Sequence, residues 1–198
     1  FIGHDPAIAS DKNADFTAMT VMRIKPDEQD RKEIVHVVHE RGMSSMAQKR
    51  MMVLLNSKFQ PELIELEGNN FQRMLAQEMR ELRADMPIRI FMTTRAKKES
   101  LFMSLLLAFE QGHIKTPYGD ERSKKYTHAL ETELNRFGMQ KSGKLESVGT
   151  HDDLAMSIAL ANWASKEFKG SVMLLDDYMP GFDDWFKGES KPGDLMIP

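Results

Sequence analysis

Acidic side chains occur at three separated points of the sequence, each where we expect a strand or a helix to begin or end. They are Asp5, Glu65, Glu67, Asp152 and Asp153. A carboxylate among apolar residues is costly to bury unless it is paired, hydrated or bound to a metal ion. Its oxygens are the ligands that Mg²⁺ and Mn²⁺ prefer, whereas histidine and cysteine favour zinc. Two such ions, about 3.5–4 Å apart, could activate a water molecule and stabilise the leaving oxygen of a phosphodiester.

Each of these acids also has a purely structural interpretation. Thr150 could cap the helix that follows it, with Asp153 at the third helical position as a variant of the capping box. Asp153 would then also suit the positive end of the helix dipole. Glu67 alone could be an exposed acid at a strand end. Asp5 fits a structural role least well, because short first strands near the centre of a sheet are usually apolar. The combination of acids at all three positions therefore favours a metal site over purely structural roles.

The composition is that of one globular domain. The 198 residues are 41% hydrophobic and 29% charged, with a net charge of −3. The absence of cysteine excludes disulfides, thiolate metal ligands and a cysteine nucleophile. No apolar run approaches the roughly 18 residues of a membrane span, and no signal peptide opens the chain. Because the chain starts at Phe1, inside an expected strand, we expect a domain excised from an intracellular protein.

The elements that must position the acids follow from hydrophobic periodicity and turn residues. The expected strands are 1–5, 16–24, 34–39, 63–67 and 88–92, and the expected helices are 44–58, 70–82, 97–111, 121–137 and 152–168. This order predicts an α/β, ribonuclease H-like mixed sheet, with an antiparallel three-strand meander, parallel strands and helices on both faces. A flavodoxin-like sheet is the main rival, but it needs a helix between the first two strands.

The charge is distributed unevenly along the chain. Residues 171–198 hold six acidic and two basic residues, a net of −4, so the chain's −3 leaves +1 for residues 1–170. Proline, glycine and aspartate are frequent in 171–198, so we expect a poorly ordered tail after a domain spanning 1–170. Between Arg95 and Lys125, seven basic residues stand against four acidic ones. This excess indicates either a basic surface or ordinary solvated helix faces.

Two further motifs resemble ligand sites without meeting their requirements. The stretch Gly138–Leu145 is close to a phosphate-binding loop, but it ends in Leu145 where the motif needs a hydroxyl to hold magnesium. We expect it to follow a helix rather than a strand, with no helix start after it to receive phosphate. His36 and His39 resemble a zinc pair, but residues three apart on a strand point to opposite faces. We expect neither motif to bind a ligand.

Taken in order, the acidic motifs resemble the nuclease domain of the terminase large subunit of tailed phages, the motor that packages viral DNA. Gly3–Ala7 followed by Asp15–Ala18 is similar to the family's opening acidic strand and hairpin. Ile64–Gln72 resembles its second acidic motif, and Thr150–Ala155 resembles its third, a His-Asp-Asp-Leu helix start. The resemblance extends to about Trp163, and three motifs in this order are far more specific than any one of them.

The resemblance implies a set of site residues. The implied catalytic metal ligands are Asp5, Glu67 and Asp153, with Asp152 and Asp15 as secondary candidates. Glu67 aligns with the motif through the Gly and Asn that follow it, so Glu65 is the weaker choice. The implied cofactor is Mg²⁺ or Mn²⁺, with two ions during catalysis. The expected contacts to DNA phosphates are Arg95, Lys97, Lys98, Lys124 and Lys125.

The implied function is metal-dependent endonucleolytic cutting of double-stranded viral DNA at the start and end of genome packaging, in the host cytoplasm. Besides DNA, the implied partners are an N-terminal ATPase domain, the portal and the small terminase subunit, with no membrane. Because these residues contain no phosphate-binding loop, we expect this fragment not to translocate DNA. Two alternatives stay open: another ribonuclease H-like nuclease, such as a junction resolvase or a hybrid nuclease, and a non-catalytic DNA- or capsid-docking module.

Overall fold

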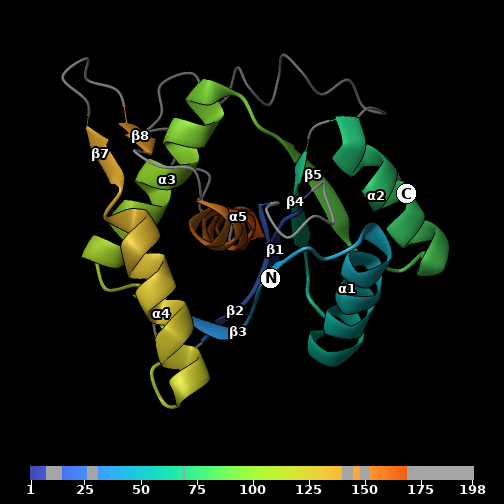
Figure 1. Ribbon diagram of the computed structural model, residues 1–198, viewed down its shortest axis with the longest axis horizontal. Coiled ribbons are helices and arrows are strands. Elements are labelled where there is room, and N and C mark those ends of the chain that lie inside the picture. Colours follow the sequence, from blue (N-terminus) through green and yellow to red (C-terminus); the bar gives the residue numbers. More distant parts are fainter. Residues whose placement is uncertain (8–14, 26–30, 69, 140–144, 148–151, 169–198) are drawn as a thin grey trace.

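The computed structural model describes residues 1–7, 15–25, 31–68, 70–139, 145–147 and 152–168. Within these ranges the chain forms a six-stranded sheet, a two-stranded sheet and five helices (Figure 1). The strands are β1 (Ile2–Asp5), β2 (Phe16–Ile24), β3 (Lys32–Arg41), β4 (Ile64–Gly68), β5 (Ile88–Met92), β6 (Ile114–Lys115), β7 (Phe137–Met139) and β8 (Leu145–Ser147). The helices are α1 (Ser45–Phe59), α2 (Asn70–Leu82), α3 (Arg95–Glu110), α4 (Glu121–Leu134) and α5 (Asp153–Phe168).

The large sheet is mixed, with the strand order β5-β4-β1-β2-β3-β6. Strands β1, β2 and β3 form an antiparallel meander, whereas β4 and β5 run parallel to β1, and β6 runs parallel to β3. This topology confirms the predicted ribonuclease H-like mixed sheet. The antiparallel pairing of β1 with β2 excludes the flavodoxin-like rival, whose sheet is parallel.

Helices cover both faces of the sheet, and each face has its own hydrophobic core. Helices α1 and α2 pack on one face, over a core that includes Ile2, Met19 and Leu66. Helix α5 lies on the other face, with α3 and α4 packed against it (Figure 1). Because α5 is enclosed by the sheet and by these two helices, its residues from Asp153 to Ser165 are buried. No helix in the described ranges is long and apolar enough to span a membrane.

Most expected elements are present within a few residues of their predicted ends, but one expectation is wrong. Helix α4 ends at Leu134 rather than at Phe137, and the strand β7 follows it. Asn135 and Gly138 are poor helix formers, which is consistent with the earlier end. The stretch that resembles a phosphate-binding loop therefore begins in β7 and ends at the first residue of β8, so among the described residues it leads into a strand rather than into a helix start. Residues 140–144 of that stretch lie outside the described ranges.

The two histidines of β3 lie on opposite faces of the sheet, as expected. The His36 ring lies near Phe59 of α1, with the ring centroids 5.7 Å apart. The His39 ring stacks on Phe16, and its Nε2 is 3.8 Å from Glu133 Oε1 of α4. They cannot share a metal ion, which confirms that the pair is not a zinc site. The predicted tail 171–198 and the predicted capping residue Thr150 lie outside the described residues.

Helix α5 approaches the sheet closely because β1 carries a glycine beneath it. A Cβ atom built on Gly3 would lie 1.9 Å from Ser157 O and 2.6 Å from Ala161 N. Both contacts are to backbone atoms of α5, which cannot move aside without shifting the helix. The position of α5 over β1 therefore depends on Gly3.

We expect Gly3→Ala to lower the free energy of unfolding by about 3 kcal/mol or more, because the added methyl group overpacks the contact between α5 and β1. Chemical denaturation followed by circular dichroism measures this. Gly119→Ala is the matched control, since a Cβ atom there meets no atom within 4 Å. A Gly3→Ala protein as stable as Gly119→Ala would show that α5 does not need this close approach.

Candidate active site

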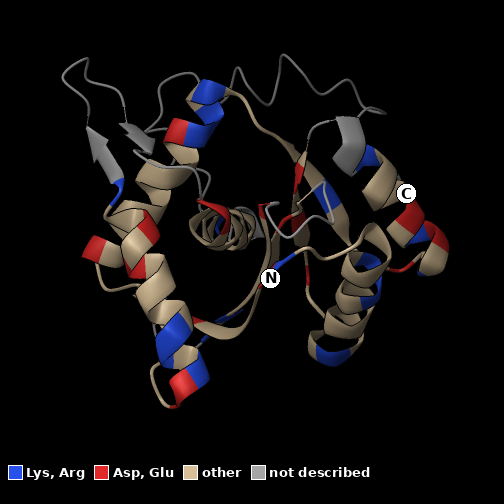
Figure 2. Cartoon of the chain, in the orientation of Figure 1, with Lys and Arg blue, Asp and Glu red and all other residues tan. Residues whose placement is uncertain are grey.

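The elements that carry the predicted acids end or begin at one edge of the sheet. Strands β1 and β4 run parallel and end at Asp5 and Gly68, and Glu67 is the residue before the end of β4. Helix α5, which packs on both strands, begins at Asp153. The carboxyl ends of parallel strands are the common place for ligand sites in α/β sheets. Figure 2 shows acidic residues where α5 begins, beside the ends of the central strands.

Four of the predicted acids are neighbours at this edge, and we call them the acid cluster: Asp5, Glu67, Asp152 and Asp153. Asp5 and Asp153 are each only 8% exposed. Burial raises the pKa of Asp5 well above its usual value, and Glu67, which is also its hydrogen-bond partner, raises it further, as do Asp153 and Asp152. The structure thus brings together residues that are up to 148 positions apart in sequence (153 − 5).

The two glutamates of β4 have different surroundings. Glu65 is 1% exposed, and Arg89 of β5 binds it through Nε at 3.0 Å and through Nη2. Such a two-pronged guanidinium contact neutralises a buried carboxylate efficiently. Glu67 instead accepts a hydrogen bond from Thr93 Oγ1 at 2.9 Å and faces Asp5. Of the two, Glu67 therefore belongs to the acid cluster, and Glu65 is held in an ion pair.

A lysine accompanies the acid cluster. Lys98 Nζ of α3 lies 2.7 Å from Asp152 Oδ2. Burial lowers the pKa of Lys98, but Asp152, Glu67 and Asp5 together outweigh this effect and raise the pKa above its usual value. Lys98 is therefore a cation held by the acids, a role that its place in a basic stretch of sequence did not indicate.

The remaining candidates lie on other segments. Asp15 is exposed on the segment just before β2. Arg95 and Lys97 lie in the first turn of α3, close to Lys98. Lys124 is in the first turn of α4, where its Nζ contacts Glu121 at 2.7 Å, and Lys125 follows it. Figure 1 places the starts of α3 and α4 at opposite ends of their layer.

The donor set of the acid cluster fits a hard divalent cation. It consists of carboxylate oxygens, and their mutual repulsion, visible in the raised pKa of Asp5, is what a cation among them would relieve. Among the described residues, however, no three histidine, aspartate or glutamate side chains already form a group able to hold a metal ion. The acids are thus neighbours of suitable chemistry rather than a closed coordination cage.

The sequence matches a known protein family over most of its length. Residues 2–162 match the model of the terminase RNaseH-like domain. The chain belongs to this family. The match covers most of the sequence and confirms the resemblance of the three acidic motifs. No curated protein matches the sequence.

Solved structures share the fold of this terminase domain. The large terminase nuclease from thermophilic phage G20c with bound magnesium superposes with a TM-score of 0.61 at 20% identity, covering 82% of this chain and 79% of that chain. The structure of the same nuclease with bound cobalt gives a TM-score of 0.61 at 21% identity, with the same coverage of both chains. A further structure of this nuclease, for which no bound metal is named, superposes with a TM-score of 0.57 at 22% identity, covering 81% of this chain and 78% of that chain.

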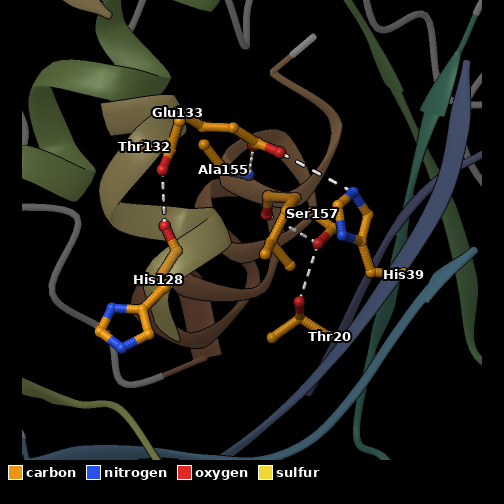
Figure 3. A network of polar contacts seen from close by, with 8 residues as sticks. Thr20, His39, His128, Thr132, Glu133, Ala155 and Ser157 are labelled. Carbon is orange, nitrogen blue, oxygen red and sulfur yellow. Dashed lines mark hydrogen bonds and ion pairs between the residues drawn. The ribbon is translucent and has the colours of Figure 1, made fainter. Parts of the chain in front are cut away.

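One functional candidate in the terminase domain was missed by sequence reasoning. Glu133, in the last turn of α4, is 5% exposed, and its Oε2 accepts a hydrogen bond from the Ala155 N–H at 2.8 Å (Figure 3). Burial raises the pKa of Glu133 to about 7, with the nearby Asp153 and Asp152 adding to the effect. Glu133 belongs to no motif, and its spacing on α4 is that of an ordinary helix residue.

We expect the metal-free terminase domain to lose stability, relative to Asp5→Asn, as the pH rises. The folded-state pKa of Asp5 is raised, so its protonated form stabilises the fold at low pH. That contribution is lost as the pH rises above the unfolded-state pKa of about 3.9. Urea denaturation in EDTA, at several pH values between about 5 and 8, measures the difference.

Asp120→Asn is the control without a pH trend. Hydrogen bonds from Ser123 lower the pKa of Asp120, so the stability that its carboxylate contributes is already fully present above the unfolded-state pKa of about 3.9. The difference between wild type and Asp120→Asn should therefore stay constant between about pH 5 and 8. An Asp5→Asn protein whose stability difference from wild type did not change with pH would contradict the crowding of acids around Asp5.

Proposed function

We propose that this terminase domain is a divalent-metal-dependent endonuclease that cuts double-stranded DNA at the start and end of genome packaging. The observation that carries this proposal is the convergence of Asp5, Glu67, Asp152 and Asp153 at one sheet edge, in a chain of the terminase RNaseH-like family. The G20c large terminase nuclease, which shares the fold, binds magnesium, cobalt and zinc in its solved structures.

In this proposal Asp5, Glu67 and Asp153 hold Mg²⁺ or Mn²⁺, with Asp152 beside them and two ions during catalysis. A divalent ion held there would activate a water molecule and stabilise negative charge on the phosphodiester, so no protein nucleophile would be needed. The chain's own residues prepare the site. Thr93 orients Glu67 through its hydrogen bond. Lys98, which forms an ion pair with Asp152, offsets part of the negative charge of the acid cluster.

We propose that DNA reaches the acid cluster across the start of α3. Arg95 and Lys97 lie in the helical turn that also carries Lys98, so their positive charges border the acids and would attract DNA phosphates. Lys124 and Lys125 lie at the other end of that layer and would contact a more distant part of the duplex. The whole terminase, in the host cytoplasm, would bring the ATPase domain, the portal and the small subunit to the same DNA.

Three isosteric variants, Asp5→Asn, Glu67→Gln and Asp153→Asn, should each lower cleavage of supercoiled plasmid in Mn²⁺ by orders of magnitude. Each removes a charge that a divalent cation needs while keeping the shape of the side chain. Glu65→Gln is the matched control on the same strand, because Glu65 is bound by Arg89, and its folded protein should keep cleaving. An active Asp153→Asn enzyme would remove this residue from the site and leave Asp152 in its place.

The choice of nucleic acid distinguishes the alternatives. Four-way junctions and RNA–DNA hybrids, offered beside linear and supercoiled duplex DNA, test for a resolvase or a hybrid nuclease. Preference for either of these substrates would overturn the packaging role. Absence of cleavage with Mg²⁺, Mn²⁺ and Co²⁺ would favour a docking module whose acids are only structural.

We expect Mn²⁺ at millimolar concentration to raise the melting temperature of the wild-type domain, and to do so more strongly than Mg²⁺. A ligand that binds only the folded state stabilises it, and here it also relieves the repulsion around Asp5. Differential scanning fluorimetry measures both shifts. Asp5→Asn should lose most of the Mn²⁺ shift, whereas Glu65→Gln should keep it. A wild-type melting curve that does not respond to Mn²⁺ would count against a site formed in the folded domain.

A further inference from the structure

We propose that Glu133 is a positioning residue of this nuclease: reaching from α4, it caps the start of α5 and so fixes the backbone that carries Asp152 and Asp153. The inference rests on the proposed function in taking these two aspartates as part of a metal site. The capping contact itself stands on the geometry of the described residues, and no sequence motif indicates it.

The start of α5 shows why a cap from elsewhere is needed. The first N–H groups of a helix have no partner within it, and the residue at the N-cap usually supplies one from its own side chain. The Asp152 carbonyl accepts from Met156 N–H at 2.8 Å, so Asp152 occupies the N-cap position. Its carboxylate, however, contacts Lys98 Nζ at 2.7 Å. The carboxylate of Glu133 takes the capping position instead, bonding the Ala155 N–H (Figure 3).

The bond from the Ala155 amide to Glu133 also affects the acid cluster. Asp153 is the first residue of α5, two residues before Ala155, so the bond that fixes the Ala155 amide also fixes the turn from which the Asp153 side chain extends. The Glu133 carboxyl group thereby also lies at the positive end of the helix dipole. Because Glu133 bonds the Ala155 amide, neither Asp152 nor Asp153 is needed as the acceptor for that N–H group.

The same turn is held from the sheet side. Ser157 Oγ lies 2.7 Å from Thr20 Oγ1 of β2 and donates to the Leu154 carbonyl at 2.9 Å (Figure 3). The start of α5 is therefore held from two sides: Ser157, in the second turn, contacts Thr20 of β2 and the Leu154 carbonyl, and Glu133 of α4 bonds the Ala155 amide. Metal ligands must be held to within a fraction of an ångström, and partners that orient them commonly affect affinity as much as a weak ligand does.

The test compares Glu133→Ala with Glu133→Gln, which keeps an acceptor oxygen for the Ala155 N–H. We expect Glu133→Ala to bind Mn²⁺ about 10–100-fold more weakly, by electron paramagnetic resonance titration, and Glu133→Gln to restore most of the affinity. In metal-free protein, hydrogen exchange at the Ala155 amide should be faster in Glu133→Ala than in wild type. Should Glu133→Ala not fold, Glu133→Asp withdraws the carboxylate by one methylene and provides the same comparison.

Thr127→Ala is the matched control for a general weakening of α4. Thr127 is also a buried polar residue of α4, but its Oγ1 donates to the Pro117 carbonyl at 2.7 Å, away from α5. It should lower the melting temperature and leave Mn²⁺ affinity unchanged. A folded Glu133→Ala protein with wild-type Mn²⁺ affinity, or one that behaves as Thr127→Ala does, would overturn the positioning role.

Failure of the proposed function would look different. If the wild type itself did not bind Mn²⁺ or cleave DNA, the nuclease proposal would fail. The exchange rate of the Ala155 amide, measured without metal, would still decide whether Glu133 fixes the turn that carries Asp153.

Discussion

Carboxylates repel one another at the end of β1, and the fold has to hold them there. Asp5 is buried, and Glu67, Asp153 and Asp152 each make its ionisation harder. No local sequence preference would gather such groups, so their approach is imposed by larger elements: parallel pairing sets Glu67 beside Asp5, and the packing of α5 brings Asp153 over them. The hydrophobic cores on the two faces of the sheet supply the free energy that offsets this repulsion.

Positive charge is distributed so that the repulsion is reduced without being abolished. Arg89 neutralises Glu65 with a bidentate contact, whereas Lys98 meets the acid cluster only at its border, through Asp152. Asp5 and Glu67 share a hydrogen bond with each other. The result is a net negative site at one sheet edge, which is the electrostatic requirement for holding a divalent cation.

The fold was largely predictable because its elements are long and periodic. The meander, the two parallel strands and the helices all show clear patterns, so their order predicted the mixed sheet. The exceptions are short: β6 has two residues, and β7 and β8 have three each, lengths at which alternation cannot be recognised. Lys98 was predicted only as a contact to DNA phosphates, and Glu133 was not predicted at all, for a different reason. Each lies within a helix and outside the three acidic motifs, and only the packing of α3 and α4 against α5 shows what it contacts.

The sequence left one question open, whether Asp153 is a helix cap or a member of a site, and the contacts around α5 bear on it. A helix start needs an acceptor for its N–H groups, and an aspartate there usually provides it. Here Glu133 bonds the Ala155 amide, and Asp152 bonds Lys98, while Asp153 lies among the groups that raise the pKa of Asp5. The acceptor for the Ala155 amide therefore comes from another helix. This arrangement satisfies that N–H group at the helix start while Asp153, the first residue of the helix, lies beside Asp5.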